Sequence, residues 1–140
     1  MAVVDAPLFG NAINLLNAYV EAETGIFVGT KVPADRPKRF IRTLRTGGFR
    51  RDAVTDVARI TFECWAPSST EAERDAQIVR DLLSRATGTV LSSRDGSRFK
   101  IHRVEEVAGP ADSPDPDTAS PRYTLTSEVH LRGRMLRSSS

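Results

Sequence analysis

The stretch DVARITFECWAPSSTEAERDAQIVRDLLSRATG, residues 56–88, carries the two patterns that decide the fold. Its first part alternates apolar and polar residues with a period of two, which is typical of a half-buried strand. The apolar face of that strand contains Ala58, Ile60, Phe62 and Cys64. Its second part has apolar residues at helical spacing. The stretch therefore predicts a strand followed directly by an amphipathic helix.

The helix has clear start and stop signals. Hydroxyl side chains at 68–70 precede glutamates at 71 and 73, which gives a capping box whether Ser68 or Thr70 is the N-cap. Gly88 supplies the stop. The predicted buried stripe contains Ala72, Ala76, Val79, Leu83 and Ala86.

A second strand is expected just upstream, in RPKRFIRTLRTGGFRR, residues 36–51. The period of two places Phe40 and Leu44 on the buried face and Arg39, Thr43 and Arg45 on the polar face. Arg42 then falls on the buried face. Either its stem lies along apolar surface while the guanidinium reaches water, or this edge of the sheet meets a partner. The glycines at 47 and 48 predict a hairpin with the following strand.

The remaining segments complete an α+β pattern. Residues 8–22 predict a first helix with a stripe of Phe9, Ile13, Leu16 and Val20, and residues 26–32 predict a strand. A hairpin about Asp95–Gly96, a surface loop at 108–121 and a last strand at 122–131 follow. We expect a mainly antiparallel sheet covered by two helices, in the order α-β-β-β-α-β-β-β. Residues 1–133 form one predicted domain, and residues 134–140 form a basic flexible tail.

Charge is distributed unevenly along the chain. Residues 31–51 contain eight basic residues and one acid, a net charge of +7, whereas the whole chain carries +2 and the remainder therefore −5. Such a polarised chain can bind a polyanion or another copy of itself. The lone Cys64 fits a reducing compartment, and no apolar run approaches the ~20 residues of a membrane span. We expect a soluble protein that does not bind a membrane.

Catalytic and metal-binding patterns are weak. Cys64, His102 and His130 form a conceivable ligand set, but no two of them are closely spaced, and core packing is the better explanation of Cys64. Glu105 and Glu106 are adjacent, so a strand sends them to opposite faces. Phosphate-binding fingerprints are absent from the sequence. We expect no enzyme activity, no metal and no cofactor.

Nucleic-acid binding is an alternative function for this chain. A basic strand face near Phe40, Phe49 and Trp65 could contact a backbone and stack on bases. The sequence contains no recognised DNA- or RNA-binding motif, so core aromatic residues with solvated or interface arginines are the favoured explanation.

Three segments together resemble a known family. They are VGTKVPADRPKRFIRTLRTGG at 28–48, FECWA at 62–66 before the capped helix, and AGPADSPDPDTASPRYTLT at 108–126. Their order and spacing are similar to those of tail terminator (tail-completion) proteins of long-tailed phages and prophages of high-GC actinobacterial hosts. The similarity spans about residues 20–133 and includes no catalytic motif. The N-terminal helix and the residues after 133 carry no signature of this family.

The resemblance implies a structural role in the virion. Members of this family are small α+β domains that form a hexameric ring on the head-proximal end of the tail tube, stop tube growth and join the tail to head-closure proteins. The implied partners are further copies of the chain, the tail-tube protein and a head-closure or neck protein. The implied location is the virion tail, after assembly in the host cytoplasm. A head-closure or connector neck protein is the alternative in the same class.

A closed ring needs two unlike patches on each subunit, because one patch of each copy meets a different patch of the next. The +7 segment and the acidic loop at 108–121 are two such patches, and their attraction would help encounter and register. Alternatively, some of the arginines line the channel and contact passing genomic DNA. The hypothetical subunit or partner interface contains Arg36, Lys38, Arg39, Arg42, Arg45, Arg50, Arg51, Asp112, Asp115 and Asp117.

Overall fold

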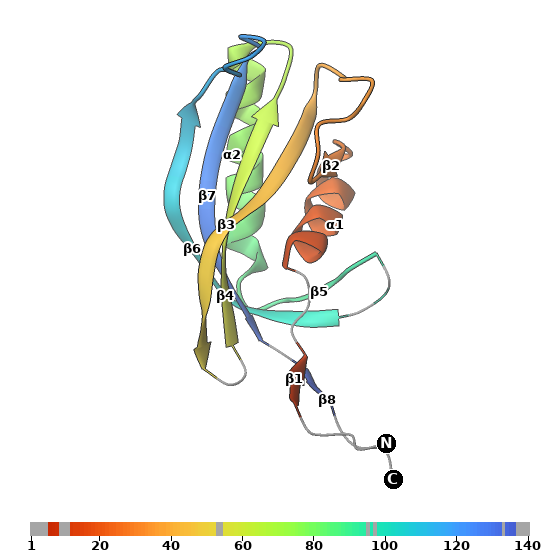
Figure 1. The fold of residues 1–140 in the computed structure, drawn as a ribbon, viewed down its shortest axis with the longest axis vertical. Helices are drawn as coiled ribbons and strands as arrows, with labels where there is room; N and C mark the ends of the chain where they lie inside the picture. The colour runs from red at the N-terminus through yellow and green to blue at the C-terminus, as the bar shows by residue number, and fades with distance from the viewer. Residues whose placement is uncertain are drawn as a thin grey trace.

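The computed structural model describes residues 6–8, 12–52, 55–94, 96, 98–132 and 134–136. Two helices pack on a six-stranded sheet, and a separate two-stranded sheet joins the first and last strands (Figure 1). The elements are β1 Ala6–Leu8, α1 Ala12–Thr24, β2 Val28–Gly29, β3 Phe40–Asp52, β4 Thr55–Trp65, α2 Ser69–Ala86, β5 Val90–Ser92, β6 Arg98–Asp112, β7 Arg122–Arg132 and β8 Arg134–Leu136. The predicted α+β class is confirmed.

The main sheet has the strand order β2-β3-β4-β7-β6-β5 and is antiparallel except for the β2–β3 pair. The order of elements from α1 to β7 follows the predicted α-β-β-β-α-β-β-β. The short pair β1–β8 was not predicted, and β8 includes residues 134–136 of the expected tail. Residues 137–140 lie outside the described residues.

The core lies between the two helices and one face of the sheet. In the view of Figure 1, α2 lies behind β4 and β7. Side chains from α1, α2 and all six strands of the main sheet form one buried cluster, and the Tyr19 hydroxyl of α1 donates to the Leu82 backbone oxygen of α2 at 2.8 Å. The predicted inward faces are confirmed for β4, with Phe62 and Cys64, and for β7, with Leu125 and Val129.

The helix signals are also confirmed. Ser68 is the N-cap of α2, where its Oγ accepts from the Glu71 backbone N–H at 3.2 Å and donates to the Glu71 carboxylate at 3.0 Å. The stop after α1 is Gly25, whose φ of 73° places it in the left-handed region that glycine tolerates. All five residues of the predicted stripe of α2 are buried. Phe9, expected in the stripe of α1, lies outside the described residues.

The prediction for the faces of β3 was wrong. Ile41 and Thr43 pair with Cys64 and Phe62 of β4, so they face the helices. Thr43 is 1% exposed and donates to the Asn17 side-chain oxygen of α1 at 2.7 Å. Phe40, Arg42 and Leu44 therefore lie on the opposite face, which no described helix covers. Arg42 is no misfit, because its face of the sheet is the polar one.

Two boundaries also differ from the prediction. The strand expected at 26–32 is reduced to Val28–Gly29, which pairs with β3 in parallel. β6 continues to Asp112, so the expected loop at 108–121 is restricted to 113–121. Because neighbouring strands run in opposite directions, their starts and ends meet at two opposite ends of the sheet. The loop end contains the start of β3, the end of β4 and loop 113–121, and the hairpin end contains the end of β3, the start of β4 and the end of β7.

Candidate interface site

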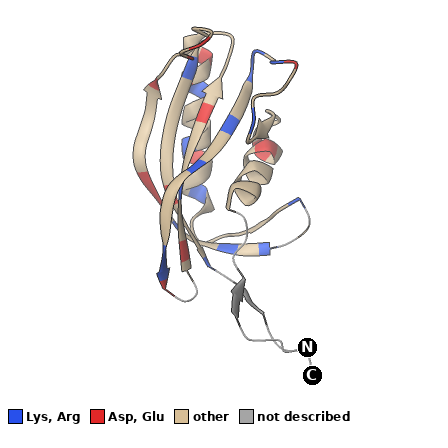
Figure 2. Cartoon of the chain, viewed as in Figure 1, with Lys and Arg blue, Asp and Glu red and all other residues tan. Residues whose placement is uncertain are grey.

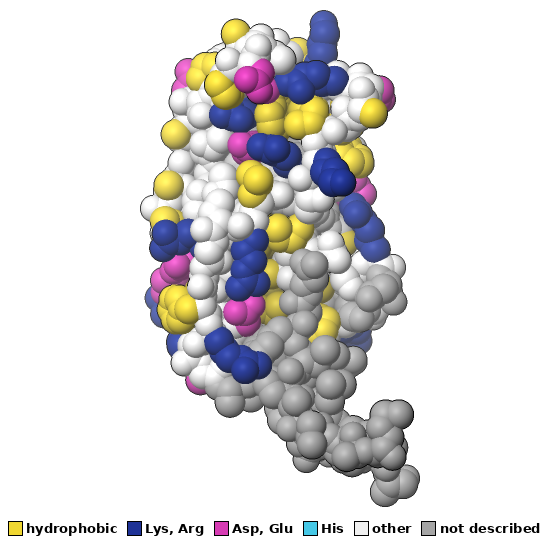
Figure 3. All heavy atoms as spheres, viewed as in Figure 1, with side chains coloured by type: hydrophobic (Ala, Val, Ile, Leu, Met, Phe, Trp, Pro, Cys, Tyr) yellow, Lys and Arg dark blue, Asp and Glu magenta, His cyan; other side chains and the backbone are white. Residues whose placement is uncertain are grey.

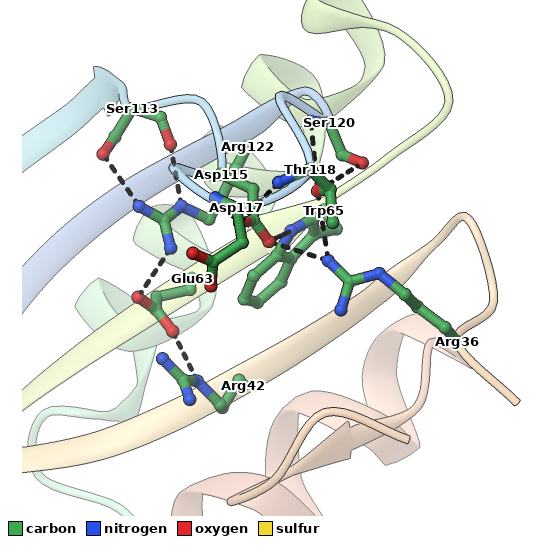
Figure 4. A network of polar contacts seen from close by, with 10 residues as sticks. All are labelled: Arg36, Arg42, Glu63, Trp65, Ser113, Asp115, Asp117, Thr118, Ser120 and Arg122. Atoms are coloured by element: carbon green, nitrogen blue, oxygen red, sulfur yellow. Dashed lines mark hydrogen bonds and ion pairs between the residues drawn. The ribbon is translucent and has the colours of Figure 1, made fainter. Parts of the chain in front are cut away.

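Trp65 is the centre of the loop end. It is the last residue of β4, and its indole stacks on Phe40, the first residue of β3, with ring centroids 4.5 Å apart and an interplanar angle of 16°. The side chain is 3% exposed, and its Nε1 donates to Oδ2 of Asp115 at 3.1 Å. A single side chain thus joins β3, β4 and the loop between β6 and β7 (Figure 4).

Asp115 receives hydrogen bonds from four donors. Oδ2 accepts from Arg36 at 2.7 Å as well as from Trp65, and Oδ1 accepts from the backbone N–H groups of Asp117 at 2.8 Å and Thr118 at 3.3 Å. These donors favour the charged form, so the Asp117 backbone contact above all, followed by Arg36 and Trp65, lowers the Asp115 pKa to about 2. Asp115 folds loop 113–121 and fastens it to the segment before β3.

A second chain of charges runs across the uncovered face beside Trp65. Glu63 accepts from Arg42 at 2.6 Å and from Arg122 at 3.1 Å, and Arg122 also donates to the Ser113 backbone oxygen at 2.7 Å. Both guanidinium groups lie over the Trp65 ring, 5.9 Å and 5.3 Å from its centroid. The Glu63 and Arg122 side chains are 11% and 12% exposed, so this network is largely buried.

The two connecting segments at the loop end are held in uncommon backbone conformations. Arg36 has φ 42° and Ala119 has φ 59°, the two non-glycine residues with positive φ in the part of the chain that the structure describes. Such conformations persist where the surroundings over-determine them. A cavity of about 310 Å³ lies between these segments, and its lining includes Lys38, Trp65, Pro67 and Pro121. The loop end is therefore a fixed surface with a concave centre.

Most basic residues of the predicted interface already have a carboxylate partner in the same chain. The pairs are Arg36–Asp115 at 2.7 Å, Arg39–Glu71 and Arg39–Asp75 at 3.0 Å, Arg42–Glu63 at 2.6 Å, Arg45–Asp56 at 3.1 Å and Arg51–Asp52 at 3.7 Å. Figure 3 accordingly shows basic and acidic side chains interspersed over the uncovered face. The +7 segment is largely neutralised within one subunit.

The other predicted interface residues are exposed. Lys38 borders the cavity at the loop end, Asp112 ends β6, and Asp117 lies in the loop. Arg50 is exposed at the hairpin end, far along β3 from Arg36. The structure thus brings Arg36, Lys38 and Asp117 together at one end and leaves Arg50 and Arg51 at the other. A contact between this set and a neighbouring subunit stays a prediction.

The sequence reasoning missed Glu63 and Arg122. Glu63 was placed correctly on the polar face of β4, but the incorrect face of β3 separated it from Arg42. The hairpin register, with Phe40 opposite Trp65 and Arg42 opposite Glu63, would have identified the pair. Arg122 lies opposite Trp65 on the other side of β4, which the sequence alone does not show.

The conceivable metal ligands do not come together. Cys64 faces the helices, whereas His130 is opposite Val57 on the other face of the sheet, and His102 is exposed on β6. Among the residues that the structure describes, no group of three His, Cys, Asp or Glu side chains could hold a metal ion. Burial raises the pKa of the Cys64 thiol, so it packs as an apolar core residue.

Comparison with known protein families gives a match. A family model described as phage tail termination protein matches residues 11–135. The match includes both helices, the main sheet and the complete loop-end network. A search of curated proteins finds no match. Within the described ranges, each helix is too short or too polar to cross a bilayer.

Proposed function

The chain belongs to the phage tail termination protein family, and from this premise we propose that it closes the head-proximal end of the tail tube as a ring. A phage tail terminator is a structural component of the virion tail. The family match over residues 11–135 carries this proposal. In this proposed role, the chain binds the last ring of tail-tube protein, stops the addition of further tail-tube subunits and offers a surface to a head-closure protein. It acts by binding rather than by catalysis, and six copies form the ring during assembly in the host cytoplasm.

The loop end has properties that suit a contact surface. Interfaces gain from surfaces that are ordered before binding, because less conformational entropy is lost on association. Trp65, Asp115 and Glu63 fix this end of the sheet through contacts from three strands and two connecting segments. The cavity beside Lys38 and Pro121 is concave enough to receive a side chain of a partner.

Loss of the protein tests the role in the virion. A phage that lacks this chain should make filled heads and tails of abnormal length that do not join, because nothing ends tube growth or connects the tail to the head. Complementation with the wild-type chain should restore joined particles of uniform tail length in electron micrographs. Tails of normal length joined to heads in the deletion phage would exclude the terminator role.

Binding in vitro separates the terminator from a neck protein. Purified chain added to polymerising tail-tube protein should stop elongation, and negative-stain images should show rings of six subunits at tube ends. Tail-tube protein with an equal amount of serum albumin is the control and should continue to elongate. A chain that binds portal or connector rings but leaves tube growth unchanged would instead be a head-closure or connector protein.

A further inference from the structure

A cluster of exposed basic residues occupies the hairpin end of the sheet, away from the loop-end network. Figure 2 shows Lys and Arg in blue at the end of β3 and near the start of β6. The ends of β3 and β7 and the start of β6 supply them, because antiparallel pairing through β4 brings these segments to the same end of the sheet. The exposed basic residues are Arg50, Arg51, Arg98, Lys100, Arg103 and Arg132. The sequence did not predict this cluster, since three strands that are far apart in the sequence contribute to it.

Two nearby carboxylates are engaged by other arginines. Asp56 accepts from Arg45 at 3.1 and 3.2 Å, and Glu128 accepts from Arg59 at 3.0 Å. Arg51 has a longer contact of 3.7 Å to Asp52, and its side chain is 43% exposed. Arg103 pairs with Glu105 at 2.8 Å and is 61% exposed. Exposed guanidinium groups therefore exceed the carboxylates that can neutralise them at this end.

A buried histidine without partners lies beneath these arginines. Phe49, Val57, His130 and Arg103 stand in one row across β3, β4, β7 and β6 on the uncovered face. His130 is 7% exposed, and neither of its ring nitrogens has a hydrogen-bond partner. Burial above all lowers the His130 pKa; Arg51 of β3 and Arg103 of β6 lower it further, whereas Glu105 of β6 and Glu128 of β7 raise it.

The four residues of this row include a cation and no carboxylate. An imidazole buried without a partner is costly, and the cations beside it oppose its protonation. Phosphates held by Arg51 and by Arg103 would offset their charges, and each guanidinium can donate two parallel hydrogen bonds to a phosphate. Phe49, whose side chain is 57% exposed, offers an aromatic face next to the same arginines.

We propose that the hairpin end binds the phosphate backbone of double-stranded DNA through Arg51, Arg103 and Arg132, independently of sequence and beyond the proposed terminator role. DNA suits the site better than the loop end of a second copy. The buried carboxylate of that loop, Asp115, is already engaged by Arg36. The exposed acids Asp112 and Asp117 adjoin Ser113 and Thr118, which accept from Arg122 and Arg36. Phosphates on a duplex are spaced regularly and can meet several arginines at once.

Bound phosphate and protonation of His130 assist each other. In the free protein the pKa of His130 lies below its ordinary value, because burial and the two arginines disfavour its charged form. A bound phosphate favours the charged form, so binding raises the pKa of His130 and takes up a proton. Affinity for DNA should therefore be higher at pH 6 than at pH 8, and His130→Gln should remove this part of the pH dependence.

The test measures binding of the full chain to a fluorescent duplex of about 20 base pairs by anisotropy, at several salt concentrations and at pH 6 and pH 8. Arg51→Glu with Arg132→Glu should raise Kd more than tenfold and reduce the slope of log Kd against log salt by about 1.8, the value for two phosphate contacts. Arg74→Glu, an exposed change on α2 behind the sheet, is the matched control and should leave the slope unchanged.

Further variants and probes keep the test decisive. Arg51→Lys with Arg132→Lys keeps the charges and should keep the slope. If the glutamate variant does not fold by circular dichroism, Arg51→Gln with Arg132→Gln replaces it, because it removes the same two cations and should also reduce the slope by about 1.8. An equal loss in the Arg74 variant would show attraction to net charge alone and overturn the site. Failure of the wild type to bind duplex at low salt, or preferential binding of poly-glutamate over duplex, would also overturn the proposal.

Discussion

Trp65 joins three segments that are far apart in the sequence. Its ring packs on Phe40 of β3, its Nε1 donates to Asp115 of the loop, and two arginines lie over its ring. A tryptophan suits this place because it combines a large apolar ring with one hydrogen-bond donor at its edge. The polar partners are satisfied by one another, so the end of the sheet can be ordered without a covering helix.

Glu63 is the shared acceptor of this network. Glu63→Gln should reduce the free energy of unfolding by about 3 kcal/mol, because it leaves Arg42 and Arg122 close together without a neutralising charge. Urea unfolding of the purified chain measures the change. Glu23→Gln, at an exposed position of α1, is the control and should stay within about 0.5 kcal/mol. A loss no larger than the control would contradict the importance of the network.

Asp115 should make stability depend on acid. Its pKa is about 2 in the folded chain and 3.8 as a reference, so its stabilising contribution is present above about pH 4 and is lost as pH falls toward 2. Asp115→Asn should be less stable than the wild type at pH 7, and the difference should narrow from pH 4 to pH 2. Urea midpoints across this range measure it. Asp117→Asn, in the same loop but exposed, should follow the wild type, and a constant gap between Asp115→Asn and wild type would refute the assignment.

At the scale of elements, the sequence predicted a helix or strand most reliably where its local signals agreed with one another. The capping box and stripe of α2 and the alternation in β4 predicted their elements correctly, because local propensity and burial agree there. β3 was misread because Phe40 is buried on a face without helices, by stacking on Trp65. Alternation identifies two faces of a strand but does not reveal which one the helices cover.

The candidate site was predictable only in part. The sequence pointed to the arginines of 36–51 and to the aspartates of the loop, and Arg36 and Asp115 do meet. It did not reveal that they meet within one chain, because that contact depends on how β3, β4 and β7 align. The cluster at the hairpin end was invisible for the same reason, as it combines residues up to 82 positions apart, such as Arg50 and Arg132.

The β3–β4 hairpin depends more on Gly48 than on Gly47. A Cβ at Gly48, which has φ 121°, would overlap the Val57 backbone oxygen of β4, whereas a Cβ at Gly47, with φ 154°, meets nothing within 4 Å. Gly48→Ala should therefore cost about 3 kcal/mol or more, and Gly47→Ala about 1 kcal/mol from backbone strain alone. Thermal and urea unfolding compare the two variants. Equal losses would show that the close approach of the two strands does not limit the hairpin.

At the scale of the whole molecule, the uneven charge along the sequence does not produce one basic surface and one acidic surface. The +7 segment suggested one basic patch facing one acidic loop. Ion pairs within the subunit instead neutralise four of its arginines, which are Arg36, Arg39, Arg42 and Arg45. What stays exposed is a mixed loop end and a basic hairpin end. The charges that fold the subunit and the charges offered to partners are therefore separate sets. Variants meant to test assembly have to come from the second set.

Lys38 and Asp112 provide such a test of the ring. Both side chains are exposed, and among the described residues neither forms an ion pair, so reversing their charges should leave the stability of the subunit within about 0.5 kcal/mol. If the loop end of one subunit meets its neighbour through opposite charges, Lys38→Glu should shift ring formation to higher protein concentration. Screening at 1 M salt, where the Debye length is about 3 Å, should weaken wild-type rings in the same direction.

The combined variant decides whether the two residues face each other. Lys38→Glu with Asp112→Lys restores opposite charges across the contact, so it should recover part of the lost assembly, whereas each single variant should remain impaired. Sedimentation velocity over a range of concentrations, at two salt concentrations, measures the fraction in rings. Arg74→Glu on α2 controls for the change in net charge. If Lys38→Glu forms rings at wild-type concentrations, the charged residues of the loop end do not hold the subunits together, and apolar contacts must do so.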